Sequence, residues 1–181
     1  MAAMIFLYFL AFICGSLTKF TDNLVDNRPQ KRFSKAAVLA GISYGLVAGF
    51  LSSTSQVFAT LATALAIAML LSGKIDARPH QAGLAALFAT ALFLGIPGID
   101  FFVLVLLAAL AFADEALNDF ADRAAKKGLV KKIVGLRPSM EIGTLAIGFL
   151  TGSFAYFFAI FSFDLAYHAI EKIMQANAKR K

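Results

Sequence analysis

The sequence predicts an all-α, polytopic integral membrane protein, folded as a single bundle of about six transmembrane helices over residues 1–181. Of these residues 60% are hydrophobic and 15% are charged, whereas soluble domains carry roughly a quarter charged residues. The apolar residues form long uncharged runs, separated by short polar segments. The lone Cys14 can form no intrachain disulfide. These observations exclude the ordinary soluble, disordered and disulfide-rich classes.

The uncharged runs set the first three expected helices, because a helix needs about 20 apolar residues to cross a bilayer. The first run covers 1–18. The second, 36–73, is nearly twice too long for one helix. Polar residues at 52–56 predict a turn in its middle, between helices at 36–52 and 56–73.

Three further helices are expected in the second half of the chain. Helices at about 80–94 and 100–123 are separated by Gly95-Ile96-Pro97-Gly98, which is typical of a tight hairpin. The last helix is expected at 142–163, with a polar-faced continuation to 174. Five spans are the alternative if one of the middle segments is re-entrant.

The basic residues predict how the bundle lies in the membrane. With six spans, the three loops on one side hold twelve of the 17 Lys and Arg, and the two opposite loops hold none. Basic loops stay in the cytoplasm, so these loops, including the basic loop 124–139, are expected there and both chain ends outside. The four basic residues of the tail, from Lys172 onward, conflict with this arrangement. The net charge of +6 indicates contact with membrane lipids rather than nucleic acid.

Small residues recur every four positions on two of the expected helices. Gly41, Gly45 and Gly49 lie on the second helix, and Gly148 and Gly152 lie on the last. Glycines at this spacing let membrane helices approach closely. They are therefore expected to be packing surfaces without a chemical role.

The chain also suggests a parallel internal repeat. A shift of 92 positions places 20–27 on 112–119, and both segments end an apolar helix and lead into a basic loop. With an insertion, Gly49-Phe50-Leu51 then matches Gly148-Phe149-Leu150. A duplication of this kind would place the two acidic segments at matching depth, facing each other.

Five of the eleven carboxylates lie in these two segments and a sixth, Asp122, follows the second, and these six are the candidate site. Helical spacing places Lys19, Asp22 and Asp26 on one face, and it gives the fifth helix a broad acidic stripe. Only uncharged residues separate Asp100 from Asp114, so Asp114 and Glu115 are expected inside the inner half of the bilayer. A carboxylate at that depth is costly and usually functional. The alternative is that each stripe is a solvated helix end.

Oxygen-rich sites that also contain Lys and Arg suit Mg²⁺ held jointly by carboxylates and a phosphate. The expected metal ligands are Asp22, Asp26, Asp114, Asp119 and Asp122. The expected catalytic residues are Asp114, Glu115 and Asp119. The expected substrate contacts, to a lipid phosphate, are Lys19, Lys74 and Arg78.

Two of these segments resemble the motifs of a known family. Asn118-Asp119-Phe120-Ala121-Asp122 is similar to the opening of the N-D-x-x-D motif of UbiA-type intramembrane prenyltransferases, and Asp22 to Asp26 resembles their D-x-x-x-D. The order is reversed relative to that family, and Lys126 stands where a further Asp would be expected. The resemblance implies a Mg²⁺-dependent reaction on a prenyl diphosphate.

Three functions follow from these patterns. The first is a Mg²⁺-dependent enzyme that acts on a prenyl or other lipid phosphate. The second is a small cation- or proton-coupled transporter that uses intramembrane carboxylates. The third is a non-catalytic membrane partner that docks through its basic loop. His80 is expected to be interfacial, and His168 is expected to pair with Asp164 at the opposite end of the bundle.

Overall fold

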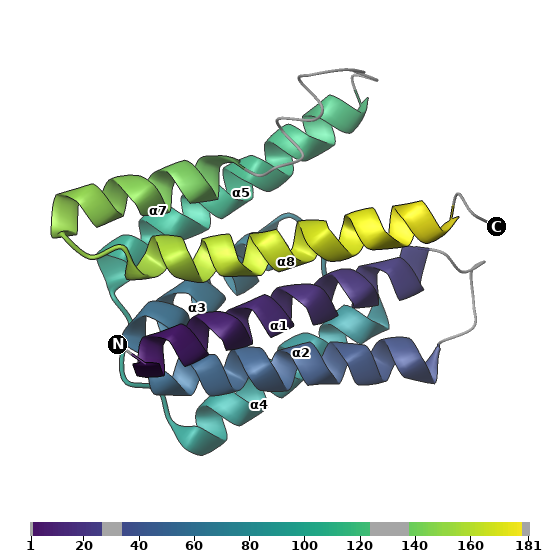
Figure 1. The fold of residues 1–181 in the computed structure, drawn as a ribbon, viewed down its shortest axis with the longest axis horizontal. Coiled ribbons are helices and arrows are strands. Elements are labelled where there is room, and N and C mark those ends of the chain that lie inside the picture. Colours follow the sequence, from purple (N-terminus) through teal and green to yellow (C-terminus); the bar gives the residue numbers. More distant parts are fainter. Residues whose placement is uncertain (1, 27–33, 124–137, 179–181) are drawn as a thin grey trace.

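The structure, a computed structural model, describes residues 2–26, 34–123 and 138–178. These residues form seven α-helices and no strand. Figure 1 shows them as an elongated bundle. The helices are α1 (Ala2–Asp26), α2 (Lys35–Thr54), α3 (Gln56–Leu71), α4 (Arg78–Leu94), α5 (Phe101–Arg123), α7 (Pro138–Thr151) and α8 (Ala155–Ala178). The predicted all-α class is therefore confirmed.

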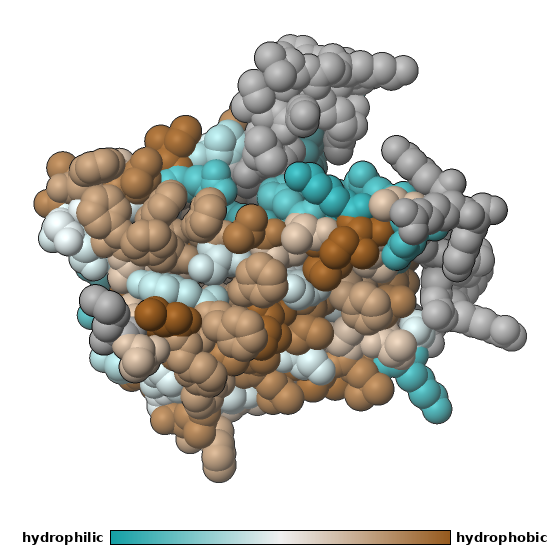
Figure 2. Space-filling model, in the orientation of Figure 1, coloured by the Kyte–Doolittle hydropathy of each residue, from teal (hydrophilic) through white to brown (hydrophobic). Residues whose placement is uncertain are grey.

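Three of the helices are long and apolar enough to cross a membrane. They are α1, α2 and the part of α5 from Phe101 to Ala121, while α3 is apolar but shorter. Large apolar side chains are also exposed on the outside of the bundle, among them Leu92, Phe93 and Phe102, each more than 80% exposed. Figure 2 shows apolar residues over most of one face. These features indicate a multi-pass membrane protein.

Successive helices run in opposite directions along the bundle, so their ends gather at two opposite ends of the molecule (Figure 1). At one end α1, α3, α5 and α8 finish and α2 and α4 begin, whereas α7 begins about midway along the bundle (Figure 1). We call this the basic end, because every Lys and Arg among the described residues lies there: Lys19, Lys35, Lys74, Arg78, Arg123 and Lys172.

The break between α2 and α3 was predicted, and it lies at Ser55. Ser55 has an extended backbone, and its side chain accepts a hydrogen bond from the backbone N–H of Val57 at 3.3 Å. A side-chain oxygen at this position satisfies one of the free N–H groups at the start of a helix. The first predicted helix, however, does not stop at Thr18, because α1 continues to Asp26.

The predicted single helix from 142 to 174 is wrong. The chain ends α7 at Thr151 and starts α8 at Ala155, and Gly152 between them has a φ of +72°. This left-handed conformation is accessible to glycine at little cost, because glycine has no Cβ. The turn sends α8 back along the bundle, so His168 lies at the basic end and not at the opposite end.

The glycine stripe of α2 packs directly on α4, as predicted. A Cβ at Gly41 would meet the carbonyl oxygen of Pro79, and a Cβ at Gly45 would meet that of Gly83. Gly49 lies in the same way against Thr90. Of the other pair, Gly148 is buried against Phe154, whereas Gly152 forms the turn described above.

The helix contacts follow a regular order. α1 packs against α2 and α8, while α5 packs against α7 and α3. α4 lies outside this order, mainly against α2. The buried core between the helices includes Phe58, Leu61, Leu107, Ile147 and Ile160.

Candidate functional site

The predicted site residues lie at the basic end, but their contacts separate them into three groups rather than one. Asp114 binds the start of α7. Glu115 and Asp119 bind Lys74. Asp22 belongs to a third group, with side chains from α2, α4 and α8.

Asp114 is almost fully buried, with 2% of its surface exposed. Its two carboxylate oxygens accept hydrogen bonds from the backbone N–H groups of Ser139 and Met140, each at 3.0 Å. These N–H groups are in the first turn of α7 and have no partner within their own helix. A carboxylate at this place also interacts favourably with the helix dipole. In this structure Asp114 therefore anchors α7 to α5.

The second group joins α5 to the segment between α3 and α4. Lys74 Nζ lies 2.5 Å from Asp119 Oδ1 and 3.8 Å from Glu115 Oε2. Glu115 is buried, whereas Asp119 is half-buried. The predicted substrate contact Lys74 is thus paired with two of the predicted catalytic carboxylates.

Asp26 and Arg78 are exposed, as is Asp76 nearby. The side chain of Asp122 and almost all of the predicted basic loop 124–139 lie outside the described residues. The last two residues of that loop, Pro138 and Ser139, already belong to α7.

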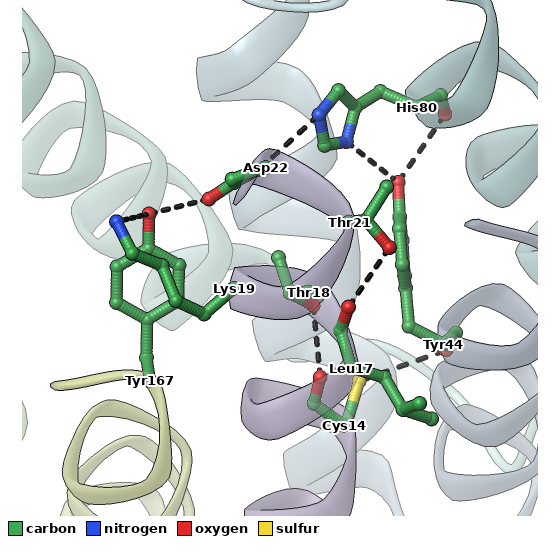
Figure 3. Close-up of polar contacts among 9 residues, drawn as sticks. All are labelled: Cys14, Leu17, Thr18, Lys19, Thr21, Asp22, Tyr44, His80 and Tyr167. Carbon is green, nitrogen blue, oxygen red and sulfur yellow. Dashed lines mark hydrogen bonds and ion pairs between the residues drawn. The ribbon is translucent and has the colours of Figure 1, made fainter. Parts of the chain in front are cut away.

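The third group is a continuous chain of polar contacts across four helices (Figure 3). His80 Nε2 lies 3.2 Å from Asp22 Oδ1, and His80 Nδ1 lies 3.2 Å from the hydroxyl of Tyr44. On the other side of Asp22, the Tyr167 hydroxyl donates to Oδ2 at 2.5 Å. We call Asp22, Tyr44, His80 and Tyr167 the Asp22–His80 network.

Lys19 and Glu171 extend this network toward the end of α8. Lys19 Nζ lies 3.2 Å from Glu171 Oε1, donates to the Tyr167 hydroxyl at 3.4 Å, and lies 4.6 Å from the centre of the Tyr167 ring. Glu171 Oε2 is 3.4 Å from His168 Nδ1. The predicted substrate contact Lys19 therefore has a carboxylate partner within the protein.

The hydrogen bonds around His80 accommodate both of its protonation states. With Nε2–H donating to Asp22, a neutral imidazole accepts the Tyr44 hydroxyl proton at Nδ1. When Nδ1 is also protonated, it can donate to the Tyr44 oxygen. The hydroxyl proton then has a second acceptor, the backbone carbonyl of His80, at 3.4 Å. Neither state leaves a donor facing a donor.

Sequence analysis missed Tyr44, Tyr167 and Glu171. The last two lie four positions apart, on one face of α8. Tyr167 and Glu171 were missed because one helix was predicted to continue through Gly152. That helix would have placed this face at the opposite end of the bundle. The signal that could have found them is Gly152-Ser153, a turn-type pair within an apolar run.

An interhelical cavity of about 140 Å³ adjoins the network. Helices α1, α2, α3, α4 and α8 line it, mostly with Ala, Leu, Ile and Phe. Its polar lining residues are Cys14, Thr18, Tyr44 and His80. His80 and Tyr44 therefore belong both to the network and to the cavity wall.

The described side chains of the predicted magnesium ligands lie in separate groups. Among the residues that the structure describes, no three His, Cys, Asp or Glu side chains form a group that could hold a metal ion. Asp22, Asp114 and Asp119 each bind another protein group instead. Magnesium stays a prediction that these contacts do not support.

Comparison of the chain with protein-family models, with curated proteins and with solved structures gives no match.

Proposed function

We propose that this protein is a small proton-coupled membrane transporter, in which the Asp22–His80 pair binds the coupling proton. The observation that carries the proposal is the Asp22–His80 network, where an ionisable pair from two helices lies against the wall of an interhelical cavity. Ionisable residues within membrane bundles commonly form proton relays and substrate pathways.

Proton binding at this pair is supported by the arrangement of Tyr44. Its hydroxyl lies near both a ring nitrogen and the backbone carbonyl of His80, so it can reorient when the ring gains or loses a proton. His is the side chain whose charge ordinarily changes near neutral pH. Tyr44 from α2 and Tyr167 from α8 contact the pair directly. Lys19 and Cys14 from α1 contact these two tyrosines, and Glu171 from α8 binds Lys19.

The order of helix contacts supports a transporter built from parallel repeats. If α1–α2–α3 and α5–α7–α8 are the two halves, the contact of α1 with α8 corresponds to that of α5 with α3. α4 then connects the halves. Secondary transporters often consist of such repeats, with the substrate site at their interface. The cavity has this position, because α8 of the second half closes it against the first half.

We place the basic end in the cytoplasm, in accordance with the positive-inside rule. The basic tail no longer conflicts with this orientation, because α8 finishes at the basic end. Segments 27–33 and 124–137, which carry most of the other basic residues, each follow a helix that finishes at the same end.

Proteoliposomes test the proposal. A membrane potential should drive proton uptake, reported by an enclosed pH-sensitive dye. Asp22→Asn and His80→Gln should each reduce the uptake at least tenfold, because each removes one member of the proton-binding pair. Asp76→Asn is the matched control, since Asp76 is an exposed carboxylate at the same end. Uptake that is absent in the wild type, or equal in all variants, would contradict the proposal.

A Mg²⁺-dependent enzyme acting on a lipid phosphate is the second candidate. The apolar cavity favours it, because a lipid chain could lie among the helices. For this function, turnover of a prenyl diphosphate should require Mg²⁺ and should be lost in Asp119→Asn.

A further inference from the structure

The residues that line the interhelical cavity extend along the bundle axis. On α3 its lining residues extend from Phe58 to Met69, which at 1.5 Å per residue is roughly 16 Å. On α4 they extend from His80 to Leu87, and on α1 from Thr18 back to Ala11. A lining of this length, mostly apolar along the helices, suits an extended unbranched or methyl-branched chain.

The cavity is polar at one end only. Thr18, Tyr44 and His80 are the lining residues nearest the basic end on α1, α2 and α4, beside the apolar Met69 and Ile75. The residues farther along, such as Leu51, Phe58 and Leu61, are apolar. An occupant must therefore have one polar group, directed toward the basic end. Its remaining length must be apolar.

The charges around the cavity indicate which polar group its ligand can carry. None of the described residues that line the cavity is a Lys, Arg, Asp or Glu. The closest cations have partners already, since Lys19 binds Glu171 and Lys74 binds Asp119. A protonated His80 is already balanced by Asp22 at 3.2 Å, so a phosphate or carboxylate in the cavity would lose its water without gaining an unpaired cation, which is costly. A hydroxyl or carbonyl can instead bond to Tyr44 and His80.

From these features we infer that the cavity binds a neutral single-chain lipid, such as an isoprenoid or fatty alcohol, with its polar group at Tyr44 and His80. This inference names the substrate class of the transporter and rests on that proposed function for its biological meaning. The polar group of the lipid competes for the hydroxyl that Tyr44 otherwise gives to His80. Occupancy of the cavity and the proton on the Asp22–His80 pair therefore influence each other through one side chain.

Binding of tritiated farnesol to the purified protein in detergent tests the inference. We expect saturable binding of one farnesol per chain, and at least tenfold weaker binding of farnesyl diphosphate. Tyr44→Phe should weaken farnesol binding about tenfold, as expected for one lost hydrogen bond. Ala62→Leu, which fills the cavity from α3, should abolish it. Ala89→Leu is the matched control, because Ala89 is exposed on α4.

Every variant must elute as folded, monodisperse protein before its binding is compared. Each outcome then has a distinct meaning. Binding that is absent, or that Ala62→Leu leaves unchanged, overturns the inference. Tighter binding of the diphosphate also overturns it, and favours the lipid-phosphate enzyme instead. Saturable farnesol binding in a protein that shows no proton uptake supports the site and refutes the transporter.

Discussion

Asp22 and Asp114 occupy equivalent positions in the predicted repeat, but their surroundings give them different roles. Asp114 binds two backbone N–H groups with both oxygens. Asp22 binds two titratable side chains, His80 and Tyr167. Sequence analysis treated the two as equal ligands, because spacing along a helix says nothing about what lies across from it. The partner across the helix interface, and not the depth alone, therefore decides which contacts each carboxylate makes.

The anchoring role of Asp114 predicts a loss of stability on substitution. Asp114→Ala leaves the N–H groups of Ser139 and Met140 without acceptors at a buried position, and it should lower the free energy of unfolding by about 1–3 kcal/mol. Asp76→Ala, at an exposed position, should change it little. Reversible unfolding in mixed micelles measures both variants. Equal stability of the two would show that Asp114 does not anchor α7.

The helices α2 and α4 show how local sequence can specify a tertiary contact. The glycines of α2 leave its backbone open along one face, and α4 fills that face with its own backbone at Pro79 and Gly83. The approach is close because Gly41 and Gly45 place no side chain of their own between the helices. This contact holds His80 against Tyr44, so the glycine stripe positions the network even though it has no chemistry of its own.

Adding one methyl group to this contact should therefore be costly. In Gly45→Ala the new Cβ would overlap the Gly83 carbonyl and the Cβ of Ala86, so α4 must move outward. We expect a loss of about 1–3 kcal/mol in unfolding free energy, typical of overpacking. Ser43→Ala serves as control, because Ser43 is exposed on the same helix. A Gly45→Ala protein of wild-type stability would mean that the helices do not touch here.

The α7–α8 turn determines the topology of the bundle. Because α8 returns to the basic end, the start of α1 and the end of α8 lie at opposite ends of the bundle (Figure 1). With α8 in this direction, nearly all of the described charged side chains gather toward the basic end. Among the described residues, the other end carries one charged side chain, Asp100, whose carboxylate accepts a hydrogen bond from the backbone of Val103 at the start of α5.

Cysteine labelling in whole cells tests this topology. Cys14 is the only cysteine, so Cys14→Ala provides a cysteine-free background. Cysteines introduced at Ile96 and Ser153, both exposed at the end opposite the basic end, should react with a membrane-impermeant maleimide from outside. Asp76→Cys should react only after the cells are opened. A Ser153→Cys protein that resists labelling, as expected for a residue within a single long helix, would contradict the turn.

The sequence by itself determined the class of the protein, most helix bounds, the turn at Ser55 and the packing role of the α2 glycines. Each of these depends on local properties: uncharged length, turn-forming residues and spacing along one helix. The tertiary structure alone decided which polar side chains meet. A single turn at Gly152 moved Tyr167 and Glu171 to the basic end, and the rotation of each helix assigned Asp114 to a backbone and Asp22 to His80. Contacts between helices depend on direction and rotation together, and a one-dimensional pattern fixes neither.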